Sequence, residues 1–515
     1  MLRTVRSFWR LTVIARTLAR HDALAALEVT GIAKPLVHGA RFVSRRRVQG
    51  RPGEKLARAL TDLGPSFIKL GQFMSTRADL VGEEVATDLA ELQDHLPPFP
   101  SEEAREIIEK DLGATLETLF ESFDETPRSA ASIAQVHMAV TSDGRPVAVK
   151  VLRPGIERAF EGDMALFYWL AGLAERTQPW LRRLKPVALV RLFEEQVRIE
   201  MDLAVEAAAA DELAQNFADD PTYNVPAVDW TRTSMRILTA QRISGTPIDD
   251  RAALIAAGHD LEAILDKAAA IFFKQVFRDG FFHGDQHPGN MFIDENGNIV
   301  AVDFGIMGRL DRDTRIFLAD MLISLLDRDY RQLAEVFVEA GYLPRPTAEG
   351  THALPVFAQA LRSVCEPIFG QPLEHISLAR LLAQLFKLSE SFQMEVQPQL
   401  LLLQKNMMMS EGVSRSLRPE LNIWTLAEPL TIQWIRENRG PEARIADTAH
   451  HVATFAKRLP KTLSRIEQIV EDVHERGLRL DAGAAGERRD GWVKLAVFLG
   501  ATGFGLGLAA LVLAL

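Results

Sequence analysis

The feature that most constrains this chain is a polar stretch, His283-Gly-Asp-Gln-His-Pro-Gly-Asn290, which is followed shortly afterwards by Asp303-Phe-Gly305. Two apolar runs lie between them, Met291–Ile293 and Ile299–Val302. These runs flank the dipeptide Asn296-Gly297, which is a strong signal for a β-hairpin turn. The sequence therefore predicts a polar loop, a hairpin and a second polar loop, in that order.

The side chains of these two loops are suited to phosphoryl transfer. Asp285 could take a proton from an acceptor, and Asn290 and Asp303 offer oxygen ligands to a hard cation. Magnesium prefers oxygen ligands and usually binds together with substrate phosphates. Asp285 and Asn290 are five positions apart, as in the kinase catalytic loop H-R-D-x-x-x-x-N. We therefore predict that the chain binds ATP and Mg²⁺ here, the alternative being a coincidental polar loop between two strands.

A second group of signals lies upstream of these loops. Val147-Ala-Val-Lys150 reads as a strand that ends in a single Lys, as in the V-A-I-K strand of kinases. A loop of small residues precedes this strand, and Gln241–Pro247 reads as a hinge where an adenine base could bind backbone groups. We predict that Lys150 binds phosphate, and that the loop residues Ser129, Ala130, Ala131, Ser132, Ile133, Ala134, Gln135 and Val136 also bind the nucleotide.

A phosphate-binding Lys of this kind needs a Glu from a nearby helix. Glu206 is the preferred partner, and Glu200 is the second choice within the same helical stretch. Glu200 and Asp202 would then be available to another cation, for which Lys69 is the obvious candidate. Gln72 lies three positions after Lys69, so a helix places both on one face. Solvated helix charges are the alternative interpretation of these acids.

Length and composition describe a folded protein with more than one domain. The chain has 515 residues, an apolar fraction of 47% and a charged fraction of 25%. Its single cysteine, Cys365, excludes a disulfide framework and is expected to be a small apolar filler. Residues 1–60 contain thirteen Lys and Arg against three acids, although the whole chain has a net charge of −10. A basic end suggests a polyanionic surface, either anionic lipid or nucleic acid.

Both ends of the chain carry signals for a membrane. Residues 1–28 read as a basic helix with apolar residues, which suits a membrane surface as well as it suits packing on the globular body. Leu495–Leu515 has no charge and would be roughly 30 Å long as a helix, enough to cross a bilayer core. Gly503 and Gly507 would let two such helices approach closely in a homodimer. We expect a single span in the inner membrane with a cytoplasmic globular body, or else a buried C-terminal helix.

Several of these motifs together resemble the UbiB family of atypical kinase-like proteins, over about residues 57–309. The matching segments are Lys69–Gln72 (K-x-G-Q), Ser129–His137, Val147–Lys150, Glu200–Asp202 (E-x-D), Asp285–Asn290 and Asp303–Gly305. The resemblance implies a kinase-like fold, ATP binding, support of ubiquinone biosynthesis, and ATPase activity more readily than protein phosphorylation. It also implies that the K-x-G-Q helix lies over the active site, with Lys69 in contact with Glu200. The expected partners are anionic membrane lipid and quinone-biosynthesis enzymes or quinone precursors, and no nucleic acid.

The chain departs from related patterns in three places. The small-residue loop usually reads A-A-A-S in the family, and here it begins with Ser129. The loop contains no Gly, and an Ala in a position that needs a positive φ would cost about 1–2 kcal/mol. We therefore expect a different path over the phosphates from that of a Gly-rich loop. After Gly305 the chain continues as Ile306-Met-Gly-Arg309 without an A-P-E, so a conventional activation segment is expected to be missing.

We predict an α+β chain with a bilobal protein-kinase-like fold, an N-terminal helical extension and a C-terminal transmembrane helix. The expected divisions are a basic segment (1–55), the extension (56–125), an N-lobe (126–245), a C-lobe (246–440), a helical linker (441–490) and the transmembrane helix (491–515). The predicted function is that of a membrane-anchored atypical kinase or ATPase. Two alternatives stay open: a small-molecule kinase of the aminoglycoside or choline type, which the H-G-D at residues 283–285 favours, and a non-catalytic scaffold of quinone biosynthesis that uses ATP as a switch.

Overall fold

The structure is a computed structural model that describes residues 2–23, 49–75, 77, 81–90, 92, 96–177, 185–343, 353–369, 377–392 and 397–418. The predicted linker (441–490), the transmembrane helix (491–515) and the Gly503/Gly507 pair lie outside these residues. Within them, no helix combines the length and the apolar character that a membrane span requires.

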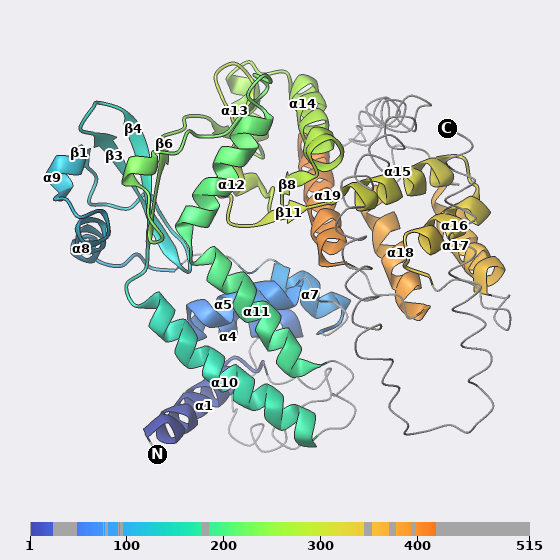
Figure 1. Cartoon of the computed structure of the whole chain (residues 1–515), viewed down its shortest axis with the longest axis horizontal. Coiled ribbons are helices and arrows are strands. Elements are labelled where there is room, and N and C mark those ends of the chain that lie inside the picture. The colour runs from blue at the N-terminus through green and yellow to red at the C-terminus, as the bar shows by residue number, and fades with distance from the viewer. Residues whose placement is uncertain are drawn as a thin grey trace, which may run out of the picture. The chain divides into compact units, whose positions relative to one another are not determined.

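A five-stranded antiparallel sheet lies in the first half of the chain (Figure 1). Its strands are β1 (Phe120–Phe123), β2 (Ser129–Ala130), β3 (Ala134–Thr141), β4 (Pro146–Leu152) and β6 (Ile237–Gln241). Their order is β1-β3-β4-β6, and β2 pairs with β3. In β4, Val147, Val149 and Val151 are buried in one cluster with Ile107 and Ile108 of α8 (Ser101–Leu112). Because successive side chains of a strand alternate between the two faces, Lys150 lies on the face away from α8.

Helices that precede this sheet, and helices inserted between its strands β4 and β6, share a second core. They are α4 (Pro52–Leu63), α5 (Pro65–Ser75), α7 (Glu83–Ala90), α10 (Ile156–Thr177), α11 (Pro186–Glu200) and α12 (Leu203–Asn216). In this core the rings of Phe67 and Phe167 meet edge to face, with centroids 5.2 Å apart. The sequence suggests one amphipathic stretch over residues 56–70, but Gly64, with φ of 101°, divides it into α4 and α5.

The N-terminal helix α1 (Leu2–Arg20) packs against α4 and the second core. The Arg10 guanidinium donates to both carboxylate oxygens of Asp163, at 2.9 and 3.0 Å, and lies over the ring of Phe67. His21 is paired with Asp62 at 2.7 Å. For this face of α1, the structure favours packing on the globular body over binding to a membrane surface.

Two smaller sheets are built from short strands between residues 223 and 309. One has four strands in the order β5 (Tyr223–Asn224), β10 (Ile299–Ala301), β9 (Met291–Ile293) and β7 (Thr246–Pro247). In the other, β8 (Phe281–His283) pairs with β11 (Met307–Arg309). Strands β9 and β10 confirm the predicted hairpin. Because β6 belongs to the first sheet and β7 to the second, residues 242–245 join the two sheets at the predicted hinge.

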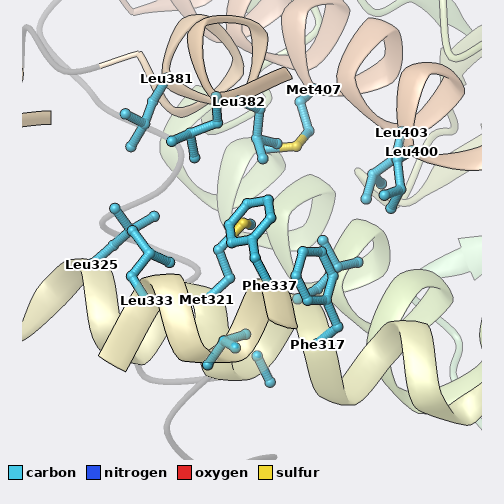
Figure 2. Close-up of a cluster of buried hydrophobic side chains, with 14 of the residues drawn as sticks. Phe317, Met321, Leu325, Leu333, Phe337, Leu381, Leu382, Leu400, Leu403 and Met407 are labelled. Carbon is cyan, nitrogen blue, oxygen red and sulfur yellow. The ribbon is translucent and has the colours of Figure 1, made fainter. Parts of the chain in front are cut away.

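The remaining described chain is helical. It contains α13 (Arg251–Ala256), α14 (Leu261–Phe273, continued by a π-helical turn over Lys274–Asp279), α15 (Arg312–Leu326), α16 (Tyr330–Glu339), α17 (Ala353–Phe369), α18 (Leu378–Ser391) and α19 (Pro398–Leu417). Figure 2 shows side chains of α15, α16, α18 and α19 converging on one apolar cluster. Cys365 of α17 is fully buried in the same cluster, which confirms that it is an apolar filler.

Candidate active site

The centre of the candidate site is an ion pair between Lys150 of β4 and Glu206 of α12. The Lys150 Nζ lies 2.8 and 2.9 Å from the two carboxylate oxygens of Glu206, and 3.3 Å from Asp303 Oδ1. Glu206 belongs to the buried stripe of α12, beside Leu203 and Ala207, and only 6% of it is exposed. A buried carboxylate needs a cationic or hydrogen-bonding partner, which Lys150 supplies. The structure thus brings together three residues that the sequence places far apart.

The charges of these three groups depend on one another. Burial by itself would lower the pKa of Lys150, but Asp303 and Glu206 outweigh it and raise that pKa. Burial raises the pKa of Glu206, and Lys150 opposes this shift. Lys150 lowers the pKa of Asp303 to about 2. At neutral pH, Lys150 is therefore a cation and Asp303 is an anion, whose side chain remains 51% exposed.

His283 fixes the start of the loop that carries Asp285. The backbone N–H of Asp285 donates to His283 Nδ1 at 3.0 Å, so the proton of this ring is on Nε2, which donates to the Val302 carbonyl at 3.2 Å. His283 is fully buried, and burial lowers its pKa, so the ring stays neutral. Asn290 closes the loop, since its Nδ2 donates to the Asp285 carbonyl at 3.1 Å. His283 thus has a structural role in holding the loop, and its ring binds the backbone of Asp285 rather than the carboxylate.

Asn290 and Asp303 are the candidate magnesium ligands, and the hairpin brings them together. The N–H of Val302 donates to the Asn290 carbonyl at 2.9 Å, so residue 303 directly follows the partner of Asn290. Asp303 has a φ of 61°, in the left-handed region that Asp tolerates better than most residues. A Cβ on Gly305 would lie 3.3 Å from Asp303 Oδ1, so a side chain there would crowd this oxygen. The amide and carboxylate oxygens fit a magnesium ion that takes its other ligands from phosphate and water.

The second carboxylate considered for Lys150 has a different partner. Glu200, at the end of α11, lies 2.8 Å from Lys69 Nζ of α5, and both side chains are largely buried. Asp202 does not meet this cation, because its carboxylate caps α12 by accepting the N–H of Ala204 at 3.1 Å. Gln72 is half-buried on the same helix as Lys69. The E-x-D motif therefore divides into an ion-pair partner and a helix cap.

The small-residue loop has a backbone conformation that does not require Gly. None of residues 129–136 has a positive φ, which agrees with the expectation of a path unlike that of a Gly-rich loop. The Arg153 guanidinium holds the loop by donating to the Ala131 carbonyl at 2.8 and 3.0 Å, and to the Pro97 carbonyl at 2.9 Å. The Gln135 side chain is fully buried and exchanges hydrogen bonds with the backbone of Phe99 at 3.0 and 3.3 Å.

The other loop residues divide between the sheet and the interior. Ser129 and Ala130 form β2 and pair with Val136 and Gln135 of β3. Ile133 and Ala134 are buried in the core of the helical extension. Ser132 is fully buried, and its Oγ has no hydrogen-bond partner among the described residues. The side chains of residues 132–135 are thus turned to the interior, whereas Ser129 is exposed.

Two residues of the site escaped the sequence prediction, and both lie on α19. Lys405 Nζ donates to Asp285 Oδ1 at 2.9 Å. Its neighbour Asn406 accepts the N–H of Gln286 at 3.0 Å and donates to the His283 carbonyl at 2.5 Å. The available signal was the polar triplet Gln404-Lys405-Asn406 between the apolar runs Leu400–Leu403 and Met407–Met409, because buried polar groups in such a helix need partners.

The segment after the D-F-G is short, as the sequence suggests. It forms β11, which pairs with β8, and α15 begins at Arg312. The chain thus runs from Gly305 into a helix of the C-terminal cluster without a long intervening loop.

Family models and curated relatives match most of this chain. The ABC1 atypical kinase-like domain matches residues 91–337, and the UbiB helical domain matches residues 361–422. A protein of Marinobacter nauticus named "Probable protein kinase UbiB" is 43% identical over 424 residues, which is 82% of this chain and 76% of that protein. A protein of the same name from Xanthomonas oryzae pv. oryzae is 40% identical over 496 residues, covering 92% of this chain and 88% of its own length. Among solved structures, the Rv3197–erythromycin complex from Mycobacterium tuberculosis is 26% identical with a TM-score of 0.48, and the match covers 72% of this chain and 93% of that one.

Proposed function

This chain belongs to the UbiB family of atypical kinase-like proteins, and on that premise we propose that it is a membrane-anchored ATPase or kinase that binds ATP with Mg²⁺ and supports ubiquinone biosynthesis. Its fold is kinase-like, with mixed helix and sheet, as the sequence predicts. The observation that carries the proposal is the meeting of Lys150, Glu206 and Asp303 at distances of 2.8 and 3.3 Å. A strand Lys, a helix Glu and the Asp of a D-F-G are the groups with which kinases bind the phosphates and magnesium of ATP.

Each residue of the site has a role in this proposal. Lys150, oriented by Glu206, binds the α- and β-phosphates, and the backbone of residues 129–136 covers them. Asn290 and Asp303 hold Mg²⁺, which supplies positive charge to the phosphate oxygens when it is bound. Asp285 orients the acceptor or takes its proton. A base positioned in this way typically contributes about 10²–10⁴-fold to the rate.

The acceptor in this proposal is water or a lipid-like headgroup rather than a protein hydroxyl. Two observations support that choice. The chain passes from β11 directly into α15, and so lacks the long segment on which kinases dock a peptide. In addition, the Lys69–Glu200 pair fastens α5 of the extension to α11, whose end lies next to the helix that carries Glu206. We place α5, the helix with the K-x-G-Q motif, over the active site.

The membrane part of the proposal depends on segments outside the described residues. Leu495–Leu515 would anchor the protein in the inner membrane, with the globular body in the cytoplasm. Anionic lipid, quinone-biosynthesis enzymes or quinone precursors would be its partners, and Gly503 and Gly507 could pair two copies.

One observation favours a second candidate, a scaffold that uses ATP as a switch without turning it over. Lys405 forms an ion pair with the Asp285 carboxylate at 2.9 Å, so the proposed general base already has a cationic partner. Quinone content in a strain that lacks this protein distinguishes the two. Rescue by wild type but not by Asp285→Asn supports catalysis, whereas full rescue by Asp285→Asn supports the scaffold.

The direct test is magnesium-dependent ATP hydrolysis by the full-length protein in the presence of anionic lipid vesicles. Wild type is compared with Asp303→Asn and with Asp249→Asn, which changes an exposed Asp near the hinge. We expect hydrolysis by wild type and by Asp249→Asn, and a loss of magnesium-dependent turnover in Asp303→Asn. Equal rates in all three would contradict the assignment of the site.

A further inference from the structure

The loop that carries the candidate base has no cation of its own. Residues 283–290 contain neither Lys nor Arg. Negative charge on a transferred phosphoryl group is usually stabilised by cationic side chains as well as by metal. Lys150 and Lys69 are already bound to the carboxylates described above. The cation that the structure places at Asp285 is Lys405, from α19.

The contact between Lys405 and Asp285 lies where a ligand can reach it. The Nζ–Oδ1 distance is 2.9 Å, and the two side chains are 30% and 26% exposed. A pair with this much exposure contributes little to stability, because water already solvates both charges. The Lys405–Asp285 pair is therefore of little value for the stability of the fold. A negatively charged ligand, by contrast, could bind to Lys405 directly.

The backbone around Asp285 is shaped to receive α19. Asn406, which is fully buried, binds the carbonyl on one side of Asp285 and the N–H on the other. At Gly284 a Cβ would lie 2.8 Å from Leu402 Cδ2 of α19 and 2.9 Å from Ile306 Cγ2. The absence of a side chain at Gly284 thus lets α19 approach the loop. Protein kinases have Arg at the position of this glycine.

The opposite face of α19 is anchored in the apolar cluster. Leu400, Leu403 and Met407 point into this cluster, where Figure 2 shows them beside Phe337 and Phe317. One side of the helix is thus held by packing and the other by Asn406, so the position of Lys405 is set before any ligand binds. Preorganisation of this kind is what makes a charge effective in catalysis.

We propose that Lys405 is the active-site cation that binds the γ-phosphate, and that the helical domain thereby completes the active site. This inference rests on the proposed function. In the transfer, the bond between the γ-phosphorus and the β,γ-bridging oxygen breaks, and its electron pair leaves on ADP. A bond forms from the acceptor oxygen to the γ-phosphorus, and the acceptor proton passes to Asp285. Lys405 stays protonated and donates to a γ-phosphate oxygen throughout.

The test compares nucleotides that differ only in the γ-phosphate. Full-length wild type, Lys405→Gln and Lys405→Arg are titrated with ATP and with ADP in the presence of magnesium, and kcat is measured on the same samples. Arg415→Gln is the matched control, since it removes one charge from an exposed position of the same helix. We expect Lys405→Gln to lose about tenfold in affinity for ATP but none for ADP, and kcat to fall about 10²-fold. Lys405→Arg should recover part of both, and Arg415→Gln should match wild type.

Several results would overturn the inference while leaving the proposed function intact. The first is that Lys405→Gln keeps both the wild-type preference for ATP over ADP and the wild-type kcat. The second is that Lys405→Gln loses the same affinity for ATP as for ADP. A rise in kcat would show that Lys405 merely blocks Asp285. Failure of wild type to bind either nucleotide would refute the proposed function and this inference together. If Lys405→Gln does not fold, Lys405→Ala takes its place, because Ala is the best helix former.

Discussion

Replacing Glu206 by Gln removes one charge from the centre of the site at almost constant volume. At 2.8 Å, the attraction between Lys150 and Glu206 is about 6 kcal/mol for an effective dielectric constant of ~20. Two effects reduce the loss. The variant no longer has to bury the Glu206 charge, which costs several kcal/mol, and Lys150 keeps Asp303 at 3.3 Å. We therefore expect a stability loss of about 1–2 kcal/mol, below the roughly 3–5 kcal/mol of a buried pair that is left without any partner.

The same substitution should have a larger effect on nucleotide binding and turnover. Without Glu206, Lys150 is left with Asp303, so the phosphate ligand and the metal ligand neutralise each other. We expect kcat/KM for ATP to fall about 10²–10³-fold, as for the loss of one preorganised electrostatic contact. ATP hydrolysis and a nucleotide titration measure this effect, and urea denaturation measures the change in stability.

Glu200→Gln is the matched control for Glu206→Gln. Glu200 is also a buried carboxylate with a Lys Nζ at 2.8 Å, but its partner is Lys69 of the extension. It should lose a similar amount of stability but much less nucleotide affinity, because Lys69 connects the extension to α11 and is not the proposed phosphate ligand. Wild-type ATP binding by Glu206→Gln would refute the orienting role of Glu206, and an equal loss of affinity in both variants would show that the two acids are not functionally distinct.

Three further predictions concern separate parts of the chain. In urea denaturation, Gly284→Ala should lose about 1–3 kcal/mol because its Cβ would lie 2.8 Å from Leu402, whereas Gly412→Ala, whose Cβ meets nothing within 4 Å, should gain about 0.5–1 kcal/mol. Burial raises the pKa of Cys365 to about 12, so a thiol reagent at about pH 8 should modify it only after denaturation, and rapid native labelling would contradict this. The pKa of Asp303 is lowered to about 2, so its contribution to stability is complete above about pH 4 and is lost as the pH falls through about 2. This loss should stay below about 1 kcal/mol because Asp303 is half exposed, and it should be missing from the thermal denaturation of Asp303→Asn.

The parts of the site that the sequence could predict are those in which chemistry fixes residue types at short separations. Asp285 and Asn290 lie on one loop, and the hairpin that follows leads directly to Asp303. The strand that carries Lys150 continues to Leu152, two residues beyond the predicted end, but its alternating pattern leaves the Lys on one face as expected. For Lys150, the sequence preferred Glu206 over Glu200, and the structure places Glu206 in contact with it. These relations depend on local periodicity, which is visible without the fold.

Relations between distant elements could not be read in this way. Lys405 and Asp285 are 120 positions apart, and nothing in the helix around Lys405 specifies which loop it meets. Their contact depends on how the cluster around α15–α18 orients α19, and that orientation is set by packing of the whole helical domain. Asp202 is a different case, because an Asp directly before a helical stretch is a common N-cap and could have been read as one.

The contacts of Arg153 and Gln135 show how the small-residue loop, which contains no Gly, is held in place. A Gly-rich loop can move over the phosphates by itself, since its backbone is not tied down by side chains. Here Arg153 joins the carbonyls of Ala131 and Pro97, and Gln135 is bound to the backbone of Phe99. The loop is therefore fastened to the segment that leads from the helical extension into α8.

The extension also holds the far side of the site, because Lys69 of α5 is bound to Glu200 of α11. The small-residue loop and the helix pair α11–α12 are thus both connected to the helices of the extension. Opening the loop would break the bonds at residues 97 and 99 unless the extension moved with it. The small-residue loop is therefore coupled to the helices that carry the K-x-G-Q motif, and a change in the position of one requires either a change in the other or the loss of these hydrogen bonds.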